Sequence, residues 1–201
     1  MAQFSSREMK DLAKAWLAIS AAFAFLYSVD LSRVSIFSGG LPFFSFSQFI
    51  LFFLISLFTV GTGFLLHELA HKIVAQKYHA RAEFHSFDFM LILALVMSLF
   101  GFLLAAPGAV FIQGRLSRRQ NGLVSVAGPL VNIVLAALFL LLTLLFGNAL
   151  FLRFGFTINA WLALFNMIPF MPFDGAKVWQ WSKGAYFTTV VLALIFVLMG
   201  F

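Results

Sequence analysis

The sequence predicts an all-α, polytopic membrane protein with about five to six transmembrane helices, a re-entrant segment, and short β-strands near a candidate functional site. Of its 201 residues, 63% are hydrophobic and only 10% are charged. The apolar residues form long runs such as Leu130 to Phe146. Because a helix needs about 20 apolar residues to cross a bilayer, such runs are typical of membrane spans. One run also holds ionisable side chains, which are costly at that depth and mark a candidate functional site.

The apolar runs place the elements in order along the chain. Two glycines and a proline interrupt the pattern after the first span, between residues 30 and 47. No repeat and no soluble domain is visible, so we expect one membrane domain over residues 1–201 with its core at 47–175. The expected apolar segments are residues 12–29, 48–78, 89–106, 123–146, 156–173 and 185–201.

The second of these segments contains "HELAH", from His67 to His71. Residues four apart share one face of a helix, so the two imidazoles can bind one metal ion. Glu68 can reach a water held in an open coordination position and take its proton. This is the HExxH arrangement of zinc metalloproteases. The motif therefore predicts a zinc site with Glu68 as catalytic base.

A zinc site of this kind needs a third protein ligand, and the chain has no cysteine to supply a thiolate. Among the acidic residues, Asp174 is the one at the end of a strongly apolar span, in "LFNMIPFMPFDGAK". Pro169 and Pro172 cannot continue a regular helix, and Gly175 permits unusual backbone dihedrals. We expect the helix to loosen there and direct the Asp174 carboxylate inward.

Taken together, "HELAH" and "NMIPFMPFDG" (Asn166 to Gly175) resemble the site-2 protease family of intramembrane zinc metalloproteases. "SVAGPLVN", Ser125 to Asn132, is similar to the Gly-Pro-x-x-Asn pattern that this family carries between the two motifs. The resemblance covers roughly residues 63–175, and is to the compact form of the family without PDZ or CBS modules. The chain departs from the family at Ala176, where a second glycine is common.

The resemblance implies a role for each matching residue. Asn166 would lie near the scissile peptide and help to hold substrate or stabilise the oxyanion, as a neutral amide donor can. Asn132 would hydrogen-bond across helices and is a candidate substrate-binding residue. The implied activity is hydrolysis of peptide bonds within or near transmembrane segments of membrane-protein substrates. The implied zinc ligands are His67, His71 and Asp174.

The basic residues predict how the chain crosses the membrane. If residues 89–106 crossed fully, Asp174 would finish on the face opposite the two histidines and no zinc site could form. If residues 88–113 instead enter and return, 11 of the 13 Lys and Arg residues are cytoplasmic, with only Arg33 and Arg153 outside. That distribution agrees with the positive-inside rule. We therefore expect a multi-pass protein of the cell membrane with its active site toward the cytoplasm.

The re-entrant segment is expected to turn near Gly101 or the Pro107-Gly108 pair. The stretch "PGAVFIQG" that closes it, residues 107–114, is too short to span and is rich in β-favouring residues. We expect an extended strand near the zinc, with an edge that pairs with an unwound substrate segment. The predicted substrate-binding residues of this strand are Val110, Phe111 and Ile112.

Two other functions fit part of the pattern. A membrane metal-ion transporter could use the His and Asp ligands as a translocation site, but it predicts further ligands, and His79 and His85 are the only other histidines. A non-catalytic scaffold descended from a protease would be expected to have lost a site residue, and none is lost. The net charge of +6 fits membrane topology better than nucleic-acid binding. The expected partners are the lipid bilayer and a transmembrane protein substrate.

Overall fold

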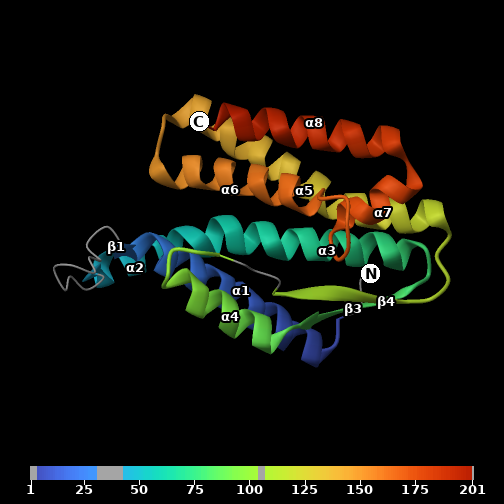
Figure 1. Ribbon diagram of the computed structural model, residues 1–201, viewed down its shortest axis with the longest axis horizontal. Coiled ribbons are helices and arrows are strands. Elements are labelled where there is room, and N and C mark those ends of the chain that lie inside the picture. Colours follow the sequence, from blue (N-terminus) through green and yellow to red (C-terminus); the bar gives the residue numbers. More distant parts are fainter. Residues whose placement is uncertain (1–3, 31–42, 104–106, 201) are drawn as a thin grey trace.

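The computed structural model describes residues 4–30, 43–103 and 107–200, which form a helical bundle with two small antiparallel sheets (Figure 1). The polar stretch expected at residues 30–47 lies mostly outside the described residues, as does Arg33. The elements are α1 (Ser6–Ser28), β1 (Val29–Asp30), β2 (Phe43–Phe44), α2 (Phe46–Ser56), the π-helical turn η2 (Leu57–Gly61), α3 (Thr62–Lys77), β3 (Arg81–Ser86), α4 (Asp88–Ser98), β4 (Gly108–Gln113), α5 (Arg118–Phe146), α6 (Leu150–Asn166), α7 (Asp174–Trp181) and α8 (Lys183–Met199).

Within the described residues, two helices are long and apolar enough to cross a membrane. One is the continuous helix Phe46–Lys77, which comprises α2, η2 and α3 and has 32 residues; the other is α5, with 29. The first contains nearly all of the span predicted for residues 48–78, and the second contains the span predicted for residues 123–146. α6 and α8 are apolar but have 17 residues each, and α1 carries several charged residues in its first half. The total number of membrane spans stays a prediction.

The span predicted for residues 156–173 is displaced in the structure. α6 begins at Leu150 and ends at Asn166, because Pro169 and Pro172 follow within two turns and exclude a regular helix. A separate short helix, α7, then begins at Asp174. The sequence does not predict α7, since eight residues are too few to display a helical period. Asp174 therefore lies at the start of a helix, after an irregular turn, rather than at the end of a span.

β3 and β4 pair as a two-stranded antiparallel sheet, called the β3–β4 hairpin below, although α4 lies between them in the sequence. The chain therefore leaves this sheet after β3 and returns to it at β4, at the same end of the molecule. α4 has 11 residues, so it is about 17 Å long against a hydrocarbon core of about 30 Å. Gly101, with φ of 78°, reverses the chain after α4. β4 then pairs with β3 from Arg81 with Gln113 to Ser86 with Gly108. The strand predicted for residues 107–114 is thus present as β4, and residues 104–106 lie outside the description.

Carboxylates of α1 hold this hairpin against α3. Glu8 accepts hydrogen bonds from the Lys72 ammonium on α3 and from the Phe84 backbone N–H on β3, the latter at 3.0 Å. The Glu8 and Lys72 side chains are each 1% exposed. One turn further along α1, Asp11 accepts from the Ser86 N–H at 3.4 Å. The outer edge of β3 is therefore occupied by α1, and a buried ion pair joins three elements.

Lys72→Met should destabilise the fold by about 3–5 kcal/mol, because it leaves the Glu8 carboxylate buried without its counter-charge. The double variant Glu8→Gln/Lys72→Met should recover most of that loss, since no unpaired charge remains and the amide carbonyl of the substituted side chain can still accept the Phe84 N–H. Lys77→Met, at an exposed position of the same helix, is the matched control. The measurement is denaturant unfolding in detergent micelles. Equal stability of Lys72→Met and Lys77→Met would contradict the prediction.

Candidate active site

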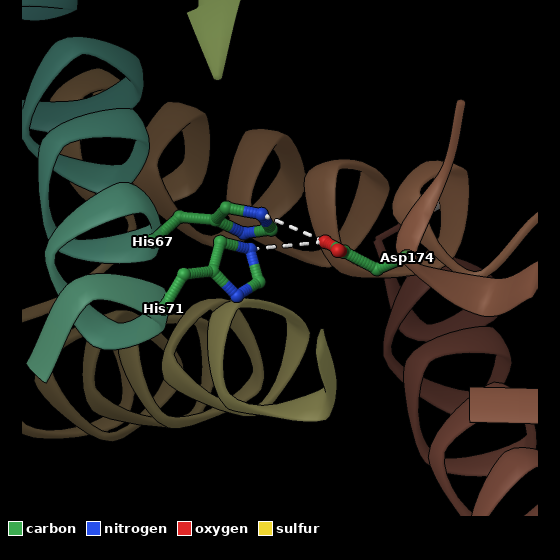
Figure 2. A group of neighbouring side chains, drawn as sticks. All are labelled: His67, His71 and Asp174. Carbon is green, nitrogen blue, oxygen red and sulfur yellow. Dashed lines mark ion pairs between the residues drawn. The ribbon is translucent and has the colours of Figure 1, made fainter. Parts of the chain in front are cut away.

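The two histidines of "HELAH" lie one above the other on α3 and face the start of α7. Figure 2 shows both imidazoles directed at the Asp174 carboxylate, which approaches from the opposite side. His67 Nε2 lies 3.3 Å and His71 Nε2 3.0 Å from Asp174 Oδ2. One ligand atom from each residue lies within 4.8 Å of the other two. Residues more than 100 positions apart in the sequence thus converge on one point.

The surroundings of the three side chains fit a zinc ion. A Cβ atom added to Gly128 on α5 would lie 2.5 Å from His71 Nε2 and 2.6 Å from His67 Nε2. The α5 backbone therefore passes directly beside the two ligand nitrogens, and a larger residue would fill the space that a metal needs. Two imidazoles and one carboxylate are also a donor set of catalytic zinc sites, in which a fourth position stays open for water.

Oxygen atoms on α5 hold both imidazole rings from behind. His67 Nδ1 lies 2.6 Å from Asn132 Oδ1, and His71 Nδ1 lies 2.8 Å from the Val124 carbonyl oxygen. Because a carbonyl oxygen accepts hydrogen bonds, we assign the proton to Nδ1 in each ring, so the Nε2 lone pairs are free to bind metal. Partners of this kind orient metal-binding histidines and increase their basicity.

Asn132 makes the hydrogen bonds across helices expected of it, and the substrate contact stays a prediction. Its Oδ1 faces His67, while its Nδ2 donates to the Gly63 carbonyl at 3.2 Å and to Asn159 Oδ1 at 3.0 Å. The residue is fully buried. Its polar atoms are thus engaged within the protein. The sequence reasoning missed Asn159, although an amide inside an apolar helix, seven residues before Asn166 and so on the same face of α6, was an available signal.

One cavity of about 400 Å³ contains the predicted catalytic residues together with the predicted metal ligands. Glu68 lies in its wall, 9% exposed, and faces the backbone amide of Val110 on β4. Asn166 lies in the wall as well and is anchored by its Nδ2, which donates to the Leu162 carbonyl at 2.9 Å. The rest of the wall is largely apolar and includes Ile19, Phe23, Val60, Phe64 and Trp161.

The side chains of β4 divide between this cavity and the opposite face of the hairpin. Val110 and Ile112 line the cavity. Phe111 points the other way, as the alternation of a strand requires; it is 49% exposed and its ring contacts those of His85 and Phe87. The structure therefore does not place the Phe111 side chain in the cavity, and a substrate contact of Phe111 stays a prediction.

The backbone of β4 presents its own hydrogen-bonding groups to the cavity. The N–H groups of Phe84 and Ser86 point away from β4 toward α1, so their positions are the non-hydrogen-bonded pairs of the hairpin. Val110 is paired with Phe84, and its N–H and C=O must therefore also point away from the hairpin, on the other edge. The N–H and C=O of Ile112, two residues further along β4, point to the same edge. Among the described residues no strand pairs with this inner edge of β4.

Two known proteins of Methanocaldococcus jannaschii are similar to the chain. It is 45% identical over 186 residues to one named "Putative zinc metalloprotease MJ0611", and the aligned region covers 90% of this chain and 87% of that protein. It is 27% identical over 118 residues to "Zinc metalloprotease MJ0392", and the aligned region covers 57% of this chain and 30% of that protein. No protein-family model and no solved structure matches the chain.

Proposed function

The chain belongs to the zinc metalloprotease family of the first of these relatives, and we propose that it is an intramembrane protease of the site-2 type. Its substrates would be membrane proteins, cleaved within or near their transmembrane segments. The observation that carries the proposal is the position of the zinc ligands. His67 and His71 lie within a continuous 32-residue helix that is apolar enough to cross a bilayer.

The cavity supplies the groups that peptide hydrolysis needs. Zinc, when bound, provides the Lewis acid that activates water and polarises the scissile carbonyl. The Glu68 carboxylate would take the proton of the attacking water and pass it to the leaving amine. Asn166 would place its amide beside the carbonyl oxygen on which negative charge develops. The apolar remainder of the wall suits the side chains of a transmembrane segment.

The site lies near the basic end of the molecule. His71 is six residues before the last residue of α3, about 9 Å along the helix axis. The end of α3, the β3–β4 hairpin and the starts of α5 and α7 lie toward the same end of the molecule (Figure 1). These elements carry Lys77, Arg81, Arg118 and Arg119. By the positive-inside rule this end would be cytoplasmic, so water would reach the site from that side.

The inner edge of β4 is the proposed binding place for the unwound substrate. Glu8 and Asp11 block the outer edge of the hairpin, whereas the N–H and C=O groups of Val110 and Ile112 lie on the inner edge, and both residues line the cavity. An extended substrate segment pairing with that edge would satisfy backbone groups on both sides. The same pairing would bring a straightened peptide bond beside Glu68.

Glu68→Gln should keep zinc but lower the cleavage of a model transmembrane substrate by about 100- to 10,000-fold, since the ligands remain and the base is lost. Glu83→Gln, on the hairpin but outside the cavity wall, is the matched control, and Asp174→Ala should lose zinc as well. The measurements are zinc content and cleavage in detergent or liposomes. Near wild-type cleavage by Glu68→Gln would refute the mechanism, and zinc transport that persists in that variant would favour a transporter.

Single cysteines test the proposed crossing pattern, because the chain has none of its own. A cysteine at Arg153 should react with a membrane-impermeant maleimide from outside the cell. Cysteines at Lys77, Arg118 and Lys183 should react only after the membrane is opened. Reaction of position 118 from outside would mean that residues 88–113 cross fully, and the re-entrant arrangement would have to be abandoned.

Val110→Pro and Ile112→Pro should each strongly depress the cleavage of a membrane substrate while leaving zinc content unchanged. Each removes a backbone N–H that lies on the inner edge of β4 and takes no part in the pairing with β3. Val110→Ala, which keeps that N–H, is the control for loss of the side chain. Ile112→Pro separates substrate pairing from the contact between the Val110 amide and Glu68. Normal cleavage by both proline variants would exclude strand addition at this edge.

A further inference from the structure

A chain of buried amides connects α6 to the zinc ligand His67. From this geometry we propose that Asn159 is a positioning residue of the zinc site: through Asn132, it fixes the orientation and the tautomer of His67. Asn159 touches neither the metal ligands nor Glu68 by any hydrogen bond, and it is fully buried. The inference rests on the zinc site itself and is independent of where the substrate is cleaved.

The direction of every hydrogen bond in the chain is set from its far end. The Gly155 carbonyl can only accept, so the Asn159 Nδ2, at 2.9 Å, faces it as donor. That leaves Asn159 Oδ1 toward Asn132, whose Nδ2 donates to it at 3.0 Å. Asn132 Oδ1 is then the atom that faces His67 Nδ1 at 2.6 Å. Because an amide oxygen only accepts, the proton lies on Nδ1, and Nε2 is left with its lone pair for zinc.

The alternative orientation of Asn132 is strongly disfavoured while Asn159 is present. Turning the Asn132 amide over would set its oxygen against two acceptors, Asn159 Oδ1 and the Gly63 carbonyl. It would also direct an NH2 group at His67 Nδ1, which would favour the proton on Nε2 and oppose zinc binding. Asn132 and Asn159 are both fully buried, and unmatched polar groups at such positions are costly. Asn159 supplies one of the two acceptors that exclude this state.

The close approach of α3 and α6 is adapted to this amide. A Cβ atom on Gly63, one turn before His67, would overlap Asn159 Oδ1. Glycine within a helix is destabilising relative to alanine. Its position here leaves the space that Asn159 occupies, so α6 contacts the metal-binding helix α3 through Asn159 and Gly63.

Zinc affinity of the purified full-length chain, measured by competition with a chromogenic chelator, tests the proposal. Asn159→Leu has a similar volume but no acceptor, and should weaken zinc binding by about 10-fold or more. Asn159→Asp keeps an oxygen toward Asn132 and should bind zinc more tightly than the leucine variant. Thr189→Val is the matched control, since it removes a buried hydroxyl that donates to the Ala185 carbonyl on α8 at 2.9 Å. It should leave zinc affinity unchanged.

A purely structural role for Asn159 predicts the opposite order, because a buried carboxyl group is costlier than a leucine. Wild-type zinc affinity in Asn159→Leu, or weaker binding by the aspartate variant than by the leucine variant, would overturn the proposal. If the leucine variant does not fold, Gly63→Ala decides: it should displace Asn159 and weaken zinc binding while circular dichroism shows unchanged helix content. Unchanged zinc affinity in Gly63→Ala would also refute the proposed role of Asn159. Since proteolysis is not the readout, this result is separable from the proposed activity.

Discussion

The contact between α5 and α3 at Gly128 is the constraint on which the rest of the site depends. Val124, Gly128 and Asn132 recur every four residues and so lie on one face of α5. Gly128 lets the backbone reach the Nε2 atoms of both histidines, and its two neighbours on that face bind the Nδ1 atoms from behind. A single helical face therefore makes room for the metal and orients two of its ligands.

Another side of α3 is held by a different kind of interaction. Lys72 follows His71 directly and points about 100° away around the helix, toward Glu8 and the hairpin. A buried ion pair adds little net stability, because desolvation offsets much of the attraction. Its geometric effect is larger, since Glu8 also binds the β3 backbone and thereby sets the position of β4 relative to Glu68. The candidate zinc ligands and the proposed substrate-binding edge are thus placed from two sides of one helix.

What could be predicted from the sequence divides according to the range of the interaction. The pair His67 and His71 needs only helical spacing, and β4 needs only a short β-favouring run between glycines, so both are readable. β3 is polar enough to pass for a loop, and its pairing depends on α1, which is remote in the sequence. The contact of Asn159 with Asn132 depends on how α5 and α6 pack, which no local pattern encodes. The early end of α6 could be predicted from the sequence, because Pro169 and Pro172 exclude a regular helix there.

The proposed location in the membrane links the hairpin to the supply of water. Backbone N–H and C=O groups that face lipid without partners cost several kcal/mol each, so an unpaired strand edge is tolerated at that depth only where it lines a hydrated cavity. The inner edge of β4 would therefore require the same water that hydrolysis consumes. A substrate strand would replace part of that hydration with backbone hydrogen bonds, while water remains near the zinc ligands and Glu68. An isolated apolar helix, whose backbone groups are already paired, would gain nothing from this edge until it unwinds. The edge would thus favour substrate segments whose helices open easily.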